Sequence, residues 1–584
     1  MNESKVTVQM QFSSGETGSP TIPALTEPPV ATEAPANPPA PATSLTGGDL
    51  LADLLIAKGV DTIFGLPGIQ LDPFFAALHD RQNRLRVVDT RHEQGAGYMA
   101  FGYSEASARP GVFAVVPGPG MLNAAAAIST AYACETSVLA LIGQIASDRI
   151  GRGLGELHEL PDQSGILSRL VRAHTLVRST GGIAPAVEDA FERLAQRGMG
   201  PVAVEVPPDV LAAPVHPSAT SPQEIRPISP EPGLIARAAE WIVSARRPMI
   251  FVGRGATHAA RAIRRIAQDQ QIPVVAQGRG KGIMDDSGPL ALNLRAAAEL
   301  WPATDLVIAI GTRMKHALVN WPRPAGQRLI VIDLDAESAP AARMADLMIR
   351  ADAAMATEAL AALLPTRTHA GHGSAAIAGA NRVMHEEFER SLAPQMTLIR
   401  ALRAVLPENG ILVTEYTQIG YVANAVFPSF HPGTIITSGY QGTLGFGFPT
   451  ALGAKVACPD RPVLALCGDG GFMFTATELA TAVKHRIGLV TIVFNDGRFG
   501  NVQRIQREAY GGRVIATDLV NPDFVRFARS FGAHGIRVED ERELGQAVRE
   551  GFAQALPTVI EVAVPELPDP WPLILPALPC TGGV

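Results

Sequence analysis

The stretch Val463–Asp496, VLALCGDGGFMFTATELATAVKHRIGLVTIVFND, decides the fold of this chain. Residues 463–467 form a short apolar run, typical of a strand buried on both faces, and the four residues 468–471 end it in a glycine turn. Apolar residues then recur at helical spacing over 472–485, and a second strand-like run covers 489–494. The pattern predicts a β-α-β unit, whose two strands are parallel and end at the same edge of a sheet.

Asp469 and Asp496 stand just after these two strands, 27 residues apart (496 − 469). Open α/β sheets bind ligands at this edge. Glycines let the backbone approach an anion. Mg²⁺ typically takes one or two protein carboxylates together with phosphate oxygens. Either fragment alone is better explained as a turn, but the pair on one β-α-β unit predicts a site for a phosphate and a divalent cation.

The composition is that of a globular protein with large cores: 584 residues, 47% hydrophobic and 18% charged, with a net charge of −7. The length predicts about three or four domains. The mild acidity gives no reason to expect a nucleic-acid partner. No apolar run reaches the ~20 residues of a membrane span. The four cysteines show no Cys-x-x-Cys spacing, which predicts packing thiols in a reducing, cytoplasmic protein; they are Cys134, Cys458, Cys467 and Cys580.

Strands alternate with helices from Thr46 onwards, which predicts doubly wound parallel sheets. Stretches rich in Pro, Ser and Ala at Val210–Glu231 and around Thr366–Ser374 are typical of linkers. The other predicted strands are Val60–Gly68 including its turn, Leu85–Asp89, Val112–Val116, Val138–Ile142, Met249–Val252, Val274–Ala276, Leu306–Ile310, Leu329–Asp333, Leu412–Glu415, Ile435–Gly439 and Thr558–Val564. The chain therefore divides into three α/β domains.

Residues 1–43 are rich in Pro, Ala, Thr, Ser and Glu and lack periodicity, so they cannot bury enough apolar surface to offset the entropy of ordering. They are expected to be a disordered tail, and a misassigned start codon explains them equally well. The segment lacks a basic start and an apolar core, so it is not a secretory signal. The proline-rich residues 566–584 either fold over the site or stay loose.

The stretch at 463–496 resembles the thiamine diphosphate motif, which begins Gly-Asp-Gly and ends one β-α-β unit later in Asn-Asn. In that family the Asp and the second Asn bind Mg²⁺, with a main-chain carbonyl two residues further on. The resemblance implies the metal ligands Asp469, Asp496 and the carbonyl of Arg498. It also implies a cofactor site that contains Gly468, Gly470, Gly471 and Asn495. Asp496 replaces the usual Asn, which keeps a hard oxygen but adds a negative charge facing a diphosphate.

The run RHEQGAGYMAFGYSEASARPGVFAVVPGPGMLNAA (Arg91–Ala125) resembles the first domain of the acetolactate synthase group. Taken alone, Glu93 is an acidic residue favoured by a helix N-terminus. In the family, the Glu of His-Glu-Gln contacts the aminopyrimidine of the cofactor. The resemblance therefore implies that Glu93 is catalytic: it shares a proton with the ring, which leads to the reactive ylid, while the cofactor supplies the electron sink.

Two other motifs of the first domain depart from the acetolactate synthase pattern. Leu157–Gln163 (LHELPDQ) lies where that group has Phe-Gln-Glu, with His158 in place of the Gln. His158 is either a catalytic proton donor or substrate contact, or a histidine of a surface loop. Gly68-Ile69-Gln70 replaces the Gly-Gly-Ala of that group, so the nature of the substrate stays open.

The run YQGTLGFGFPTALGAKVA (Tyr440–Ala457) resembles the family's segment in which a bulky apolar residue wedges the cofactor into its bent form. Here that residue is Leu444, with Gly442 beside it in the cofactor site; the wedge brings the reacting groups close together. The alternative is that Leu444 belongs to the core. The resemblance also implies a homodimer, and tetramers are common, because Glu93 of one subunit meets the metal site of its partner.

The resemblance covers all three domains. It implies a pyrimidine-binding domain (44–215), a middle domain (232–365) and a diphosphate- and Mg²⁺-binding domain (375–565). The middle domain binds FAD in acetolactate synthases. Gly253–Ala256 is a weak nucleotide motif, and the family's Met-His-Gly run is not evident at Gly280–Asn293, so FAD stays an open alternative.

The predicted function is that of a thiamine diphosphate- and Mg²⁺-dependent enzyme of the acetolactate synthase-like group. It would decarboxylate a 2-oxo acid and either protonate the resulting enamine or ligate it to a second carbonyl. The segments Leu157–Gln163 and Gly439–Gly447 also resemble decarboxylases of arginine-derived 2-oxo acids. The alternatives are a genuine acetolactate synthase large subunit, a simple 2-oxo acid decarboxylase, and a non-catalytic regulatory protein with the same fold.

Overall fold

The computed structural model describes residues 45–196, 200–215, 227–336, 339–366 and 371–579. The predicted disordered tail 1–43 and Cys580 lie outside these ranges, as do parts of both predicted linkers and the last five residues of the predicted C-terminal tail. In the described ranges, no helix is long and apolar enough to cross a membrane.

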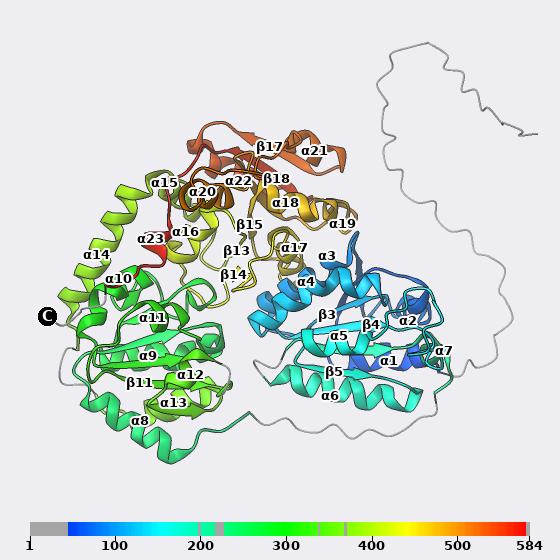
Figure 1. The fold of residues 1–584 in the computed structure, drawn as a ribbon, viewed down its shortest axis with the longest axis horizontal. Helices are drawn as coiled ribbons and strands as arrows, with labels where there is room; N and C mark the ends of the chain where they lie inside the picture. Colours follow the sequence, from blue (N-terminus) through cyan, green and yellow to red (C-terminus); the bar gives the residue numbers. More distant parts are fainter. Residues whose placement is uncertain (1–44, 197–199, 216–226, 337–338, 367–370, 580–584) are drawn as a thin grey trace, which may run out of the picture. The chain divides into compact units, whose positions relative to one another are not determined.

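Three six-stranded parallel sheets follow one another along the chain (Figure 1). The first sheet consists of β1 (Thr62–Gly65), β2 (Arg86–Asp89), β3 (Gly111–Val115), β4 (Val138–Gly143), β5 (Ala173–Leu176) and β6 (Val202–Val206). The middle sheet consists of β7 (Pro248–Val252), β8 (Val274–Ala276), β9 (Ala291–Leu292), β10 (Leu306–Ile310), β11 (Arg328–Asp333) and β12 (Leu347–Arg350). The third sheet consists of β13 (Ile411–Thr414), β14 (Ile435–Thr437), β15 (Val463–Gly468), β16 (Val490–Asn495), β17 (His534–Val538) and β18 (Thr558–Ala563).

The strand orders confirm the predicted doubly wound α/β class. They are β2-β1-β3-β4-β6-β5 in the first sheet, β12-β11-β10-β7-β8-β9 in the middle sheet and β14-β13-β15-β16-β18-β17 in the third. In each sheet the chain starts inside, moves to one edge, and then returns to build the other side. The point where the direction reverses leaves a crevice at the carboxyl ends of two neighbouring strands.

Helices connect the strands in all three regions. Those around the first sheet are α1 (Gly47–Ala57), α2 (Asp72–His79), α3 (Glu93–Ser107), α4 (Pro119–Cys134), α5 (Gln163–Leu170), α6 (Ile183–Ala195) and α7 (Pro208–Ala212). Those of the middle region are α8 (Pro232–Ser244), α9 (Ala260–Gln270), α10 (Leu294–Leu300), α11 (Lys315–Asn320), α12 (Pro340–Met344) and α13 (Ala353–Leu363). The last are α14 (Ser374–Ser391), α15 (Ala393–Arg403), α16 (Gln418–Val426), α17 (Gly447–Ala457), α18 (Asp469–Thr475), α19 (Leu479–Lys484), α20 (Gly500–Ala509), α21 (Phe524–Ser530), α22 (Leu544–Phe552) and α23 (Trp571–Ile574).

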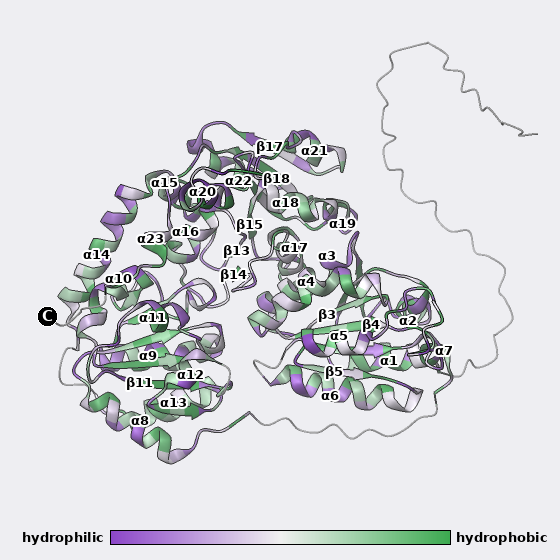
Figure 2. Ribbon diagram, viewed as in Figure 1, coloured by the Kyte–Doolittle hydropathy of each residue, from purple (hydrophilic) through white to green (hydrophobic). Residues whose placement is uncertain are grey.

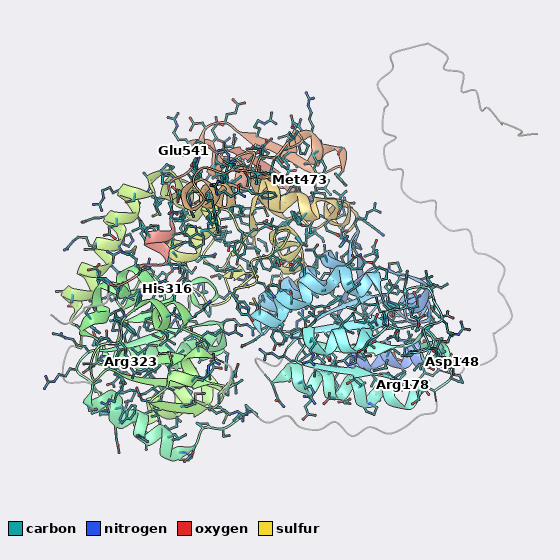
Figure 3. All side chains as sticks on the ribbon, viewed as in Figure 1. Asp148, Arg178, His316, Arg323, Met473 and Glu541 are labelled. Atoms are coloured by element: carbon teal, nitrogen blue, oxygen red, sulfur yellow. The ribbon has the colours of Figure 1, made fainter. Side chains whose placement is uncertain are left out.

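The strands carry the core. Most residues of β3, β4, β10 and β15 are buried, because layers of helices cover the sheets. Figure 2 shows hydrophobic residues along β3 and β4. Exposed charged residues such as Asp148, Arg178 and Glu541 lie at the periphery in Figure 3. Cys134 and Cys467 are buried free thiols, as predicted.

The prediction of a single helix over 472–485 is wrong, because the structure has two helices there. The helix begins earlier, at Asp469, and breaks into α18 and α19 around a 3-10 turn. Glu478 in that turn is fully buried, and its carboxylate accepts hydrogen bonds from the main-chain N–H groups of Arg91 and His92, at 3.0–3.2 Å. A contact to the first domain therefore overrides the continuous helical pattern.

Helices α3 and α17 cross at close range and join the first and third regions. A Cβ at Gly102 would collide with the backbone of Thr450, and one at Gly453 would collide with the backbone of Met99. Glycine at both positions lets the two backbones touch. This crossing fixes α3, and with it Glu93 at the first turn of that helix.

Candidate active site

A cavity of about 340 Å³ opens at the carboxyl edge of the third sheet. It lies at the point where the strand order reverses, between β13 and β15. Tyr416 and Thr417 line it after β13, Gly468–Gly471 line it after β15, and Asp496 lines it after β16. A crevice of this kind is the usual ligand site of a doubly wound sheet.

The cavity brings together most residues that the sequence singled out in the third domain. Its lining contains Gly442, Leu444, Gly468, Asp469, Gly470, Gly471, Asp496 and Arg498. Asn495 is not among the lining residues: its side chain donates to Glu561 at 2.9 Å and accepts from Asn521 at 3.0 Å. Asn495 therefore does not line the cavity but stabilises the strand ends beside it through these two hydrogen bonds.

Asp469 is buried at the first position of α18, and hydrogen bonds fix both its oxygens. Oδ1 accepts from the N–H of Gly470 at 2.8 Å, and Oδ2 accepts from the N–H of Gly497 at 2.9 Å. Asn521 Nδ2 donates to the same Oδ2 at 2.6 Å. Burial raises the pKa of Asp469. Sequence analysis missed Asn521 because it lies in an irregular loop with no motif around it.

Asp496 faces the charge of Asp469. Burial, and then the Coulomb repulsion from Asp469, raises the pKa of Asp496 to about 6. Two carboxylates close enough for the charge of one to raise the pKa of the other form a donor set for a cation. Hard oxygen donors of this kind suit Mg²⁺. The residues present therefore fit a magnesium ion, and Asp in place of Asn does not spoil the donor chemistry.

The glycines of the motif make room for a ligand and for their neighbours. A Cβ at Gly470 would lie 2.5 Å from the Phe499 ring, and one at Gly471 would lie 2.7 Å from the carboxylate of Glu415. Both N–H groups belong to the first turn of α18, where main-chain donors have no backbone partner within the helix, and that of Gly470 donates to Asp469 Oδ1. The N–H of Gly471 therefore fits a phosphate oxygen of a diphosphate.

Leu444 is half-buried and lines the cavity, instead of packing into the core. Gly442 and Gly445 flank it with φ of +66° and +77°, values that favour glycine. This placement favours a contact between Leu444 and a ligand over the alternative of a core residue.

Glu415 holds the loop that carries Leu444, and sequence analysis treated it only as the end of a strand. Its Oε1 accepts from the N–H groups of Gly445 at 2.6 Å and Phe446 at 3.0 Å. Oε2 has no hydrogen-bond partner within the described residues. Burial raises the pKa of Glu415 to about 7. An acidic residue directly after a short buried strand, Ile411–Thr414, was the signal available in the sequence.

Glu93 lies away from this cavity, at the N-terminus of α3. It is buried, and its Oε2 accepts from Asn123 Nδ2 of α4 at 3.0 Å. A Cβ at Gly120, also in α4, would lie 3.5 Å from Oε1. No residue of the first domain is among those lining the cavity in the described part of the chain. The two halves of the predicted site are therefore not joined within one subunit.

His158 lies in the loop between β4 and α5 and is half-buried. Its ring is hydrogen-bonded to Gln70, since Nδ1 lies 3.1 Å from Gln70 Oε1. The structure thus joins two departures from the acetolactate synthase pattern that the sequence showed separately.

The first residues after β18 lie at the cavity. Pro565, Glu566 and Leu567 line the cavity, and Arg504 of α20 forms an ion pair with Asp569. The first residues of helix α20 line the same cavity. The C-terminal segment and α20 therefore form one wall.

Comparison with known proteins agrees with this geometry. Three family models match in order: the N-terminal TPP-binding domain of thiamine pyrophosphate enzymes over residues 45–166, their central domain over 235–363, and their C-terminal TPP-binding domain over 416–562. Together they cover more than half of the chain.

Three similar proteins illustrate the relationship. A probable 2-ketoarginine decarboxylase of Pseudomonas aeruginosa is 34% identical over 539 residues, which cover 90% of this chain and 95% of the relative. The acetolactate synthase large subunit IlvB1 of Mycobacterium tuberculosis is 31% identical and covers 91% and 90% of the two chains. The mitochondrial acetolactate synthase catalytic subunit of Saccharomyces cerevisiae is 29% identical and covers 92% and 82%. The chain belongs to the thiamine pyrophosphate enzymes and is a thiamine diphosphate-dependent enzyme of the acetolactate synthase-like group.

Proposed function

We propose that this enzyme decarboxylates a 2-oxo acid and releases an aldehyde, with thiamine diphosphate anchored through Mg²⁺ in the cavity of the third sheet. The observation that carries the proposal is the pair of carboxylates, Asp469 and Asp496, at neighbouring strand ends beside the first turn of α18. When bound, thiamine diphosphate supplies the nucleophilic carbon and the electron sink that decarboxylation needs.

The proposal assigns a role to the candidate residues of the cavity and to Glu93. Asp469, Asp496 and the carbonyl oxygen of Arg498 would hold the Mg²⁺, while the N–H group of Gly471 would donate to a phosphate oxygen. Leu444, held between two glycines in left-handed conformations, would support the bound cofactor. The Glu93 carboxylate, positioned by Asn123, would exchange a proton with the aminopyrimidine ring.

The site is completed by a second copy of the chain. In the proposed homodimer, the first-domain edge with Glu93 covers the cavity of the other subunit, and two such dimers could form a tetramer. Large exposed apolar side chains near both edges support this pairing. They are Ile69, Leu122 and Leu157 in the first domain, with exposures of 63%, 46% and 61%, and Met473 and Phe474 of α18, with 40% and 58% (Figure 3 labels Met473).

The first candidate substrate is a 2-oxo acid with a guanidino group. It is supported by the likeness to the 2-ketoarginine decarboxylase over 95% of that protein and by the segments at 157–163 and 439–447. The second candidate substrate is pyruvate, which would be converted to acetolactate. It is supported by acetolactate synthases that are 29–31% identical over most of their length.

A second cavity, of about 390 Å³, bears on FAD. Its lining includes the loop Gly253–Gly255 after β7, Gly311 after β10 and Asp333 at the end of β11. Burial raises the pKa of Asp333 to about 6. This cavity is the candidate site for FAD, so every assay is run with and without it.

The experiment uses the full-length protein with thiamine diphosphate and Mg²⁺ and a panel of 2-oxo acids that includes 2-ketoarginine and pyruvate. Carbon dioxide release and products are followed by mass spectrometry. The proposal expects an aldehyde from 2-ketoarginine. Acetolactate from pyruvate would support the second candidate instead. No CO₂ from any substrate, with the cofactor bound, would contradict both and favour a non-catalytic protein.

A further inference from the structure

Two side chains at positions that depart from the acetolactate synthase pattern form a hydrogen-bonded pair. Gln70 lies in a 3-10 turn (Ile69–Leu71) after β1 and is 6% exposed, while His158 lies in the β4–α5 loop. They are 88 residues apart along the chain, yet His158 Nδ1 is 3.1 Å from Gln70 Oε1. The pair links two loops at the carboxyl edge of the first sheet.

The orientation of the Gln70 amide fixes the tautomer of the His158 ring. Gln70 Nε2 donates to the carbonyl oxygen of Leu157 at 3.0 Å, and a carbonyl oxygen can only accept. The end of the amide that faces the ring is therefore its oxygen, so Nδ1 must carry a proton. The neutral ring then has its lone pair on Nε2. Among the described residues, no hydrogen bond occupies that nitrogen.

The backbone of His158 has an unusual conformation and lies next to the start of α4, the helix that contacts Glu93. Its φ is +70°, in the left-handed region that non-glycine residues seldom adopt. A Cβ at Gly118, the residue before α4, would collide with the carbonyl oxygen of His158. The first turns of that helix carry Asn123, which donates to the Glu93 carboxylate, and Gly120, where an added Cβ would lie 3.5 Å from Glu93 Oε1. Backbone strain of this kind is concentrated at functional sites.

We propose that Gln70 is a positioning residue that leaves Nε2 as the only proton-exchanging nitrogen of His158, and that His158 protonates the product carbon through Nε2. The inference rests on the proposed function and decides which product forms. In the reaction R–CO–COO⁻ + H⁺ → R–CHO + CO₂, the C–C bond breaks and its electron pair stays on the former carbonyl carbon. Solvent first protonates Nε2, so that the ring is an imidazolium; that carbon then takes the proton from Nε2, which leaves the ring neutral again.

The consequence concerns the choice between aldehyde and hydroxy-ketone. A proton donor beside the carbon that has lost CO₂ captures it before a second carbonyl compound adds. The Gln70–His158 pair therefore directs this chain towards simple decarboxylation. Gln70, which is buried, and His158 both stand at positions where the acetolactate synthase pattern has other residues, in its Gly-Gly-Ala and Phe-Gln-Glu motifs.

The test separates protonation from C–C bond cleavage. Ferricyanide oxidises the same decarboxylated fragment without protonation at that carbon: R–CO–COO⁻ + H₂O + 2 [Fe(CN)₆]³⁻ → R–COO⁻ + CO₂ + 2 H⁺ + 2 [Fe(CN)₆]⁴⁻. Aldehyde formation and ferricyanide-coupled CO₂ release are measured on the holoenzyme with the best 2-oxo acid of the panel. The variants are His158→Gln, Gln70→Met, Gln70→Glu and the double variant.

We expect His158→Gln to lower aldehyde kcat about 100-fold and Gln70→Met about 10-fold. Ferricyanide-coupled CO₂ release and KM stay within about threefold of wild type, because cleavage does not need the ring. Gln70→Glu keeps an acceptor for Nδ1–H and restores most of the rate. Gln70→Met has no further effect in the His158→Gln background, because Gln70 acts only through the ring.

Gln270→Met is the matched control. Gln270 is also buried, at 2% exposure, and its Nε2 donates to the carbonyl oxygen of Pro365 at 2.6 Å in the middle region. Its substitution leaves the product ratio unchanged. His158→Gln, at a half-exposed position, decides the question even where the buried Gln70 variants fail to fold.

The inference is overturned if the two activities fall together in the His158 and Gln70 variants, since that marks a structural role. Unchanged aldehyde formation in His158→Gln overturns it as well. A wild-type enzyme that releases CO₂ only with ferricyanide, or that makes only a hydroxy-ketone, contradicts the inference and leaves thiamine diphosphate chemistry standing. Absence of CO₂ under both conditions contradicts the proposed function itself.

Discussion

The first and third sheets have the same strand order but different carboxyl edges. Numbered from its own first strand, each sheet runs 2-1-3-4-6-5, so β3 corresponds to β15. After β15 come Gly468–Gly471 and a cavity that contains Asp469. After β3 come Pro117–Gly120, beside Val116, and a Cβ at Gly68 would lie 2.5 Å from the Val116 side chain. With the same strand order, the third sheet has an acidic edge with a cavity, and the first sheet has a tightly packed edge. The loops, and not the topology, therefore carry the chemistry.

The largest effect is expected at the acidic edge. Asp469→Asn removes a charge from the proposed metal site, and we expect CO₂ release to fall about 1,000-fold or more, together with loss of Mg²⁺-dependent cofactor binding. Calorimetric titration with thiamine diphosphate and Mg²⁺ measures the binding. Asp209→Asn is the control, because Asp209 accepts from Ser147 in the first domain, at 2.9 Å from the N–H. Unchanged Mg²⁺ dependence in Asp469→Asn would remove the distinction between the two edges.

The packed edge is tested at Glu93. Glu93→Gln is expected to lower CO₂ release about 100- to 1,000-fold while cofactor and Mg²⁺ binding remain, because the carboxyl exchanges a proton and binds no metal. Steady-state kinetics and the same titration measure both. Glu188→Gln, on α6 and paired with Lys58, is the control. Wild-type activity in Glu93→Gln would show that the first sheet has no catalytic part.

A smaller effect is expected for Leu444→Ala. The side chain is half-buried, so its truncation should shift the thermal unfolding midpoint little, whereas kcat should fall about 10-fold because the cofactor loses its support. Leu363→Ala on α13, where the leucine is 54% exposed, is the control. A large loss of stability with unchanged kcat would place Leu444 in the core after all.

The smallest effect sharpens the electrostatics of the acidic edge. Burial, followed by the charge of Asp469, raises the pKa of Asp496 to about 6. Mg²⁺ requires the ionised carboxylate, so protons compete with it below about pH 6, and wild-type Mg²⁺ affinity should fall up to about tenfold per pH unit there. Asp496→Asn should have a shallower slope, with the remainder due to Asp469. Mg²⁺ titrations at pH 5 and pH 7 compare them, and equal slopes would contradict this account.

The sequence allowed the class of fold and most of the central strands to be predicted, because those strands are buried on both faces and read as apolar runs. Strands β5, β9, β12 and β17 were not predicted; each lies at an edge of its sheet. Edge strands have one neighbour and need no continuous apolar pattern; β17, for example, reads HGIRV. The interior strand β6 was also missed, and it contains the buried Glu205.

The candidate site divides in the same way. Asp469, Asp496 and the glycines could be predicted because a motif with fixed spacing places them on one β-α-β unit. Glu415, Asn521 and the Gln70–His158 pair could not, because each acts through a partner far away in the sequence. The break between α18 and α19 has the same cause: Glu478 bonds to residues nearly 400 positions earlier, at a |i−j| of 387. Local patterns contain no information about such contacts.

The most direct test of the central claim mixes two inactive variants, Glu93→Gln and Asp469→Asn. If each site takes Glu93 from one subunit and Asp469 from the other, a mixed dimer has one intact site and one doubly altered site. Coexpression with random pairing should then recover about a quarter of wild-type activity, as expected for a two-fold symmetric dimer. If both residues serve a site within one subunit, the mixture stays as inactive as its parents, and the account of two edges meeting across a dimer is wrong.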